Sequence, residues 1–115
     1  MNILNEPSLD HEAIAILKDA TDEMFNEIIM AFLEDTPKRL NLLCQAIDEN
    51  NIQSLTEESH CIKGSSGNIG ALKLSKICEI IEKSSKNDGI TNQKEYIQLA
   101  INEFDTIEME LTKLL

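Results

Sequence analysis

The stretch that decides the fold of this chain lies just past its midpoint and reads Ser59-His60-Cys61-Ile62-Lys63-Gly64-Ser65-Ser66-Gly67-Asn68-Ile69-Gly70-Ala71. Apolar and small side chains recur at helical spacing through it and just before it, at Leu55, Ser59, Ile62, Ser66 and Ile69. Positions three and four apart share one face of a helix. At about 100° per residue, His60 and Gly64 fall on the opposite side and Lys63 on the flank. The stretch therefore predicts a helix with a buried face and a histidine on its polar face.

The same spacing recurs on both sides of this helix. We expect helices at about 10–20, 22–49, 54–68, 71–84 and 91–115. The aromatic content is 3%, with no Trp, so Leu, Ile, Ala and Met must build the core, which favours helices over a sandwich of sheets. Short connections between long amphipathic helices predict an all-α fold, an antiparallel up-down four-helix bundle with an additional short N-terminal helix. The length of 115 residues suits a single domain over 1–115.

Polar residues predict where several of these helices begin and end. Asp10 is a candidate N-cap, with Leu9 and Ile14 placed to form a hydrophobic staple across it. The sequence Ser54-Leu55-Thr56-Glu57 matches a capping box for the third helix. Gly70, after Gly67-Asn68, predicts the end of that helix, and Lys86-Asn87-Asp88-Gly89 predicts a turn after the fourth.

The second predicted helix contains a proline. Its apolar positions keep one helical phase on both sides of Pro37, at Phe25, Ile29, Phe32, Leu40, Leu43 and Ile47. Thr36-Pro37 also fits an N-cap followed by proline at the first helical position, which would begin a new helix. The unbroken phase favours one long, kinked helix that ends at Asn50-Asn51.

Charge and cysteine usage exclude several classes of function. The formal net charge is −11, with a single Arg, which argues against binding of nucleic acid or of an anionic membrane surface. Three cysteines without close spacing argue against a disulfide framework or a zinc site. The first residues lack the basic and apolar pattern of a signal peptide, and no apolar run is long enough to span a membrane. We expect a cytoplasmic protein.

His60 is the candidate functional residue. A histidine on a polar helix face is usually an ordinary surface residue, but here Gly64 in mid-helix costs about 0.5–1 kcal/mol relative to Ala. A bare strip beside His60 would let another protein approach the ring, and the Lys63 ammonium would offset part of the charge of a phosphoryl group there. Glu57 and His60 also have the spacing of a di-iron site. That site needs a second copy on another helix, and the other histidine, His11, has Ser8 in place of the glutamate, so no metal is expected.

The stretch from His60 to Ala71 resembles the pattern H-x-x-K-G-S-[SA]-x-x-[LIM]-G-A of histidine-containing phosphotransfer (HPt) domains. The resemblance extends over about residues 9–84. It implies a four-helix bundle with an extra N-terminal helix. It also implies a phosphorelay carrier whose His60 is phosphorylated on Nε2 and relays the group between aspartates of two receiver domains.

The resemblance further implies that Lys63 steadies the phosphoryl group, Gly64 leaves room for the receiver and Glu82 accepts a hydrogen bond from Nδ1 of His60. Lys86 would be a second cation near the phosphate. The expected partners are receiver domains of a hybrid sensor kinase and a response regulator, which would supply Mg²⁺, so the chain needs no cofactor of its own. It lacks a nucleotide-binding loop and should not phosphorylate itself from ATP. The polar face around His60 favours a monomer. The alternative is a helical module that binds a receiver or kinase without transferring phosphate.

Overall fold

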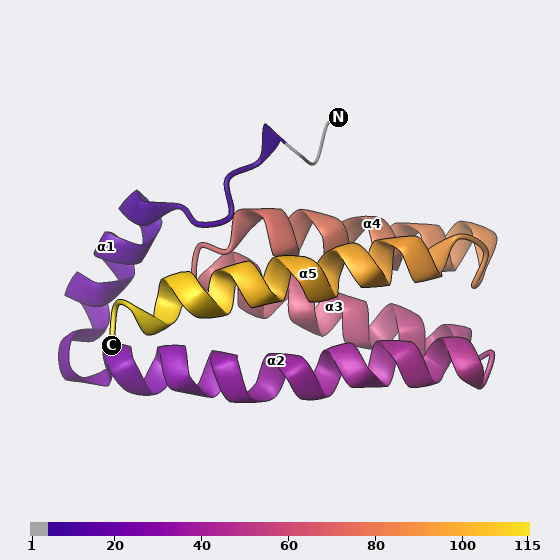
Figure 1. Ribbon diagram of the computed structural model, residues 1–115, viewed down its shortest axis with the longest axis horizontal. Coiled ribbons are helices and arrows are strands. Elements are labelled where there is room, and N and C mark those ends of the chain that lie inside the picture. The colour runs from indigo at the N-terminus through magenta and orange to yellow at the C-terminus, as the bar shows by residue number, and fades with distance from the viewer. Residues whose placement is uncertain (1–4) are drawn as a thin grey trace.

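The computed structural model describes residues 5–115 of the chain. Within that range the regular elements are all helical and follow in the order α1 (His11–Thr21), the 3₁₀ turn η2 (Asp22–Met24), α2 (Phe25–Asp48), α3 (Ile52–Asn68), α4 (Leu72–Asp88) and α5 (Gln93–Thr112). Helices α2 to α5 run up and down beside one another, and α1 lies across one end of this bundle (Figure 1). The molecule measures 41 × 27 × 20 Å along its principal axes. The prediction of an all-α four-helix bundle is confirmed.

One continuous apolar core fills the bundle. All four long helices contribute fully buried side chains, among them Leu43 of α2, Ile62 of α3, Ile81 of α4 and Ile107 of α5. The apolar positions of the second predicted helix are all buried: Phe25, Ile29, Phe32, Leu40, Leu43 and Ile47. Burial of a large aliphatic side chain contributes about 1.5–3 kcal/mol, so this core is the main source of the stability that holds the site in place.

Helix α2 is one uninterrupted helix with Pro37 inside it, so a break at this residue is excluded. A proline lacks the N–H that would bond the carbonyl four residues earlier, which costs the helix interior about 3 kcal/mol. The buried face on both sides of Pro37 compensates for that loss. The α-helix begins at Phe25 rather than at residue 22, because Asp22 has a positive φ of 46° and opens the 3₁₀ turn.

The predicted start of α3 at Ser54 is wrong by two residues. Asn51 is the N-cap, and its side chain accepts a 3.0 Å hydrogen bond from the backbone N–H of Ser54. Asn is as good an N-cap as Ser, and the capping-box pattern at Ser54 is therefore one turn inside the helix.

The predicted end of α4 at residue 84 is also wrong, since the helix continues through Asp88. Ser85 is buried, and its hydroxyl lies 2.7 Å from that of Thr56 on α3, so a tertiary contact holds the extra turn. The helix ends at Gly89, whose φ is +68°.

Helix α5 is shorter than the predicted span of 91–115. It begins at Gln93, because Asn92 has a left-handed backbone, and it ends at Thr112. Leu115 is 46% exposed and lies past the end of the helix.

The end of α3 is tied to the start of α1. Gly70 has φ +81°, and its carbonyl accepts a 2.7 Å hydrogen bond from the N–H of Asp10. A Cβ at Gly70 would lie 3.2 Å from the Asp10 carbonyl oxygen and 3.3 Å from Ile14, so glycine is required there. Asp10 caps α1 as predicted, accepting from the N–H of Ala13, and Leu9 and Ile14 are both buried.

Candidate functional site

Helices α3 and α4 are the most closely packed pair of helices in the bundle. Small residues at their interface allow this close approach. Ser59 and Ser66 of α3 are fully buried, as predicted for that face. Ser75 of α4 donates a 2.9 Å hydrogen bond to the carbonyl of Lys63, and a Cβ on Gly67 would lie only 3.5 Å from the Ser75 hydroxyl. The close approach brings side chains from the polar edge of α3 within reach of side chains on α4.

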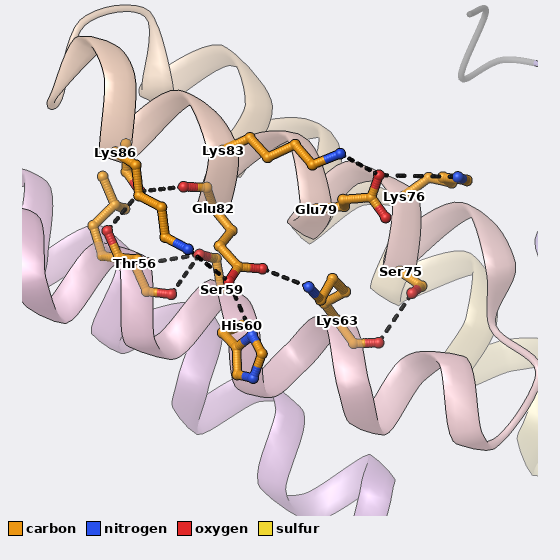
Figure 2. Close-up of polar contacts among 12 residues, drawn as sticks. Thr56, Ser59, His60, Lys63, Ser75, Lys76, Glu79, Glu82, Lys83 and Lys86 are labelled. Atoms are coloured by element: carbon orange, nitrogen blue, oxygen red, sulfur yellow. Dashed lines mark hydrogen bonds and ion pairs between the residues drawn. The ribbon is translucent and has the colours of Figure 1, made fainter.

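His60 lies on this edge with its ring open to solvent. Its side chain is 65% exposed, and Nδ1 lies 2.9 Å from Oε2 of Glu82 on α4 (Figure 2). Glu82 is buried, with 7% of its surface exposed. The two residues are 22 positions apart in sequence, and the pairing of α3 with α4 brings them together.

Glu82 also binds two lysines. Nζ of Lys63 lies 2.7 Å from Oε1, and Nζ of Lys86, one turn further along α4, lies 3.5 Å from Oε2. The short contact between the Lys63 ammonium and Oε1 is an ion pair. Burial acts to raise the pKa of Glu82, but Lys63 and His60 outweigh it and hold that pKa below its ordinary value. Glu82 is therefore ionised at neutral pH.

The charge of Glu82 fixes the tautomer of His60. An ionised carboxylate only accepts hydrogen bonds, so Nδ1 must carry the proton in the 2.9 Å contact. In the neutral ring this leaves the lone pair on Nε2, the nitrogen on the far side from Glu82. The geometry thus presents a fixed, solvent-accessible nucleophilic nitrogen.

Gly64 lies one turn after His60 on the same helix. A Cβ at this position would have no heavy atom within 4 Å apart from the adjoining backbone, so packing inside the molecule does not require glycine. Its cost to α3 is about 0.5–1 kcal/mol relative to Ala. The space beside the exposed imidazole is therefore left open by the absence of a side chain at Gly64.

A groove lies between α2 and the C-terminal half of α3. Ile28 and Phe32 of α2 and Ile69 at the end of α3 give it an apolar floor, while Ser65 and Asn68 lie on the α3 side. An open groove with an apolar floor is a surface on which another protein could dock.

Two hydroxyl groups that the sequence did not point to hold Glu82 in place. Ser85 donates a 2.8 Å hydrogen bond to the Glu82 carbonyl, and the same hydroxyl lies 2.7 Å from that of Thr56 on α3. The chain links the backbone of Glu82 to the turn of α3 that precedes His60. Their signal in the sequence is weak, because Ser and Thr on helices are common.

Glu57 and His60, which have the spacing of a di-iron ligand pair, make contacts with different partners. The Glu57 side chain accepts a 3.0 Å hydrogen bond from Gln53, and His60 binds Glu82 instead. Within residues 5–115, no three His, Cys, Asp or Glu side chains are grouped so that they would hold a metal ion. In the same part of the chain no helix has the length and hydropathy to cross a membrane.

Comparison with known proteins agrees with this geometry. The family model of the Hpt domain matches residues 27–115. The crystal structure of histidine-containing phosphotransfer protein B (HptB) from Pseudomonas aeruginosa PAO1 superposes with a TM-score of 0.91 at 25% sequence identity, over 95% of both chains. No curated protein matches the chain. The chain belongs to the Hpt domain family and is a histidine phosphotransfer carrier of phosphorelay signalling.

Proposed function

We propose that this chain accepts a phosphoryl group on Nε2 of His60 from the aspartate of one receiver domain and passes it to the aspartate of another. The observation that carries the proposal is the exposed His60 ring, whose Nδ1 is held 2.9 Å from Glu82 while Nε2 stays free. His11, the other histidine, has no such arrangement among the described contacts.

The proposed step conserves atoms and protons. The lone pair of Nε2 attacks phosphorus in line with the aspartyl oxygen, the N–P bond forms, and the P–O bond of the acyl phosphate breaks with its electrons left on the aspartate. The Nδ1 proton stays on the ring, so the product carries an imidazolium beside the phosphoryl dianion. Glu82 stabilises that imidazolium, and the reverse step returns the group to a second aspartate.

Lys63 and Lys86 supply the positive charge that the incoming dianion needs. Both ammonium groups already lie within 4 Å of Glu82, next to the ring. Charge-assisted hydrogen bonds from either group would lower the cost of placing two negative charges beside an acidic protein. Mg²⁺ is expected in the receiver, and no phosphorylation from ATP is expected.

Gly64 and the groove between α2 and α3 would form the contact surface for the receiver. An aspartyl phosphate reaches His60 only if the backbones come close, and Gly64 removes the side chain that would stand in the way. The proposed partners are receiver domains of a hybrid sensor kinase and of a response regulator, met by a cytoplasmic monomer.

The test is transfer of labelled phosphate from phosphorylated receivers to three proteins: the wild type, His60→Gln and His11→Gln. We expect acid-labile, base-stable label on the wild type and on His11→Gln, and none on His60→Gln. His11 is the matched control, because it is the other histidine and is also exposed.

Label that persists in His60→Gln refutes the assignment. Binding of receivers without any uptake of label by the wild type instead favours the alternative function, a module that docks without transferring phosphate.

A further inference from the structure

The positive charge of this acidic chain is concentrated beside His60. Residues 60–86 hold five of the ten Lys and Arg residues but only two of the 21 Asp and Glu residues. Glu57 and Glu58 precede this segment by one turn, and Glu58 is already paired with Arg39 of α2 at 2.8 Å. The formal net charge of −11 is therefore distributed unevenly, with one basic edge on an acidic molecule.

The structure arranges four of these lysines into one strip. Lys76, Lys83 and Lys86 recur at steps of seven and three along α4, and Lys63 reaches the same edge from α3; we call these four the lysine strip (Figure 2). Steps of seven and three keep successive side chains on the same side of a helix. Only Lys63 and Lys86 contact Glu82, so the strip extends past the site along α4.

Two glutamates lie within the strip and do not neutralise it. Glu82 pairs with Lys63 and Lys86, while Glu79 lies 3.2 Å from Lys83 and 4.0 Å from Lys76. Four ammonium groups thus surround two carboxylates. Lys83 is 72% exposed and Lys86 60% exposed, so the excess positive charge faces solvent.

We propose that the outer half of the lysine strip, Lys76 and Lys83, is a second contact surface that binds the acidic rim around the phosphorylated aspartate of a receiver domain. This rests on the proposed function, which requires that partner to carry a phosphoryl dianion and a carboxylate. A local basic edge attracts the acidic rim of the receiver, while the acidic remainder of the molecule repels it. Encounters in the productive orientation therefore become more frequent.

The size of the strip favours a compact anionic partner over an extended one. Nucleic acid or an anionic membrane presents charge over tens of ångströms and would also meet the acidic remainder, which holds 19 Asp and Glu residues against five Lys and Arg. At about 0.1 M salt the Debye length is about 10 Å, so a compact acidic rim responds mainly to the strip.

The test compares Lys83→Glu with Lys113→Glu. The two lysines match closely: Lys83 is 72% exposed and lies 3.2 Å from Glu79, and Lys113 is 69% exposed and lies 3.8 Å from Glu110 on α5. Each variant changes the net charge equally and breaks one ion pair with a nearby glutamate, within α4 for Lys83 and at the end of α5 for Lys113. Association with an unphosphorylated receiver is measured by stopped-flow, phosphate transfer is measured from the phosphorylated receiver, and labelling by phosphoramidate, a small phosphoryl donor, reports the state of His60.

At about 20 mM salt we expect Lys83→Glu to slow association and transfer about three- to tenfold and Lys113→Glu to leave both within about twofold. Lys83→Gln should fall between Lys83→Glu and the wild type. At about 0.5 M salt the difference should shrink to within about twofold, because screening removes it. Phosphoramidate labelling should be the same in all four proteins.

Equal rates for Lys83→Glu and Lys113→Glu overturn the inference, and so does a defect that persists at high salt or that appears with phosphoramidate. Binding of the wild type to anionic vesicles or duplex DNA that Lys83→Glu abolishes also overturns it. Association without transfer in the wild type refutes the proposed function. The role of the lysine strip is still tested in that case, because the association rates of Lys83→Glu and Lys113→Glu can be compared. A wild type that associates with no receiver refutes both.

Discussion

At the scale of the residue, Glu82 organises the site. It is buried, it accepts the Nδ1 proton of His60, and it lies within 4 Å of the ammonium groups of Lys63 and Lys86. A buried carboxylate without partners would be costly, and the two ammonium groups together with the Nδ1–H donor of His60 make its ionised form favourable. The same residue therefore fixes the histidine tautomer and gathers the positive charge that a phosphoryl group needs.

The depressed pKa of Glu82 predicts a pH dependence of stability. Because the pKa is lower in the folded than in the unfolded chain, the ionised group stabilises the fold above its ordinary pKa of about 4.3, and this contribution is lost as the pH falls through the folded-state value. In urea denaturation from pH 7 to pH 3, the free energy of unfolding of the wild type relative to Glu82→Gln should be constant above about pH 5 and should decrease below it.

Glu79→Gln is the control for this experiment. The pKa of Glu79 is also lowered, chiefly by its hydrogen bond with Lys83, but its side chain is 30% exposed and solvent screens the interaction. The free energy of unfolding of the wild type relative to Glu79→Gln should therefore change less with pH than that relative to Glu82→Gln. A difference between wild type and Glu82→Gln that is flat from pH 7 to pH 3 would contradict the role assigned to Glu82.

At the scale of the element, α3 contains a glycine with low helix propensity, Gly64, one turn after His60. Gly64 lies in the interior of Ile52–Asn68 and meets nothing that requires glycine. Gly70, which ends the motif, is different, because its positive φ and its contacts with Asp10 and Ile14 exclude a side chain. The fold therefore requires glycine at Gly70 but not at Gly64.

Substitutions at Gly64 should separate stability from transfer. Gly64→Ala should raise the free energy of unfolding by about 0.5–1 kcal/mol, because alanine has the better helix propensity and its Cβ has room. Gly64→Arg should fold, yet it should slow transfer from a receiver by about tenfold or more because its side chain occupies the approach to His60. Urea denaturation and transfer kinetics measure the two effects.

Asn102→Arg on α5 is the control, since it adds the same charge at an exposed position away from His60. It should transfer phosphate at the wild-type rate. Unchanged transfer in Gly64→Arg would count against the steric role of this glycine, and a less stable Gly64→Ala would show that α3 needs glycine for its own packing.

At the scale of the whole molecule, charge and core act against each other. A net charge of −11 on a molecule of 41 × 27 × 20 Å gives strong self-repulsion, which the apolar core has to overcome. The lysine strip relieves this repulsion along only one edge.

Added salt should therefore stabilise the protein. Between about 20 mM and about 0.3 M NaCl we expect the free energy of unfolding to rise by roughly 1 kcal/mol, because screening weakens the repulsion among carboxylates more than it weakens the fewer ion pairs. Urea denaturation at fixed pH across this range of NaCl measures the change. A loss of stability on adding salt would mean that the ion pairs outweigh the repulsion.

The sequence by itself predicted the helical fold and singled out His60 as the candidate phosphoacceptor. Apolar side chains at steps of three and four are a local signal, and this signal predicted the continuous phase of α2 across Pro37 and the buried positions of α3. His60, Lys63 and Gly64 lie within five residues on one helix, so their helical spacing alone places them near one another.

Only the tertiary structure decided how the site is assembled and where two helices end. Glu82 meets His60 because small residues let α3 and α4 approach, and that packing depends on residues far apart in sequence. The last helical turn of α4 is held by the contact of buried Ser85 with Thr56. The local sequence Lys86-Asn87-Asp88-Gly89 instead predicted a reverse turn, because it carries no signal of that contact. Helical periodicity acts within one element, whereas burial and ion pairing act between elements. Residue spacing therefore predicted the helices, and only the resemblance to HPt domains pointed to the contact between Glu82 and His60.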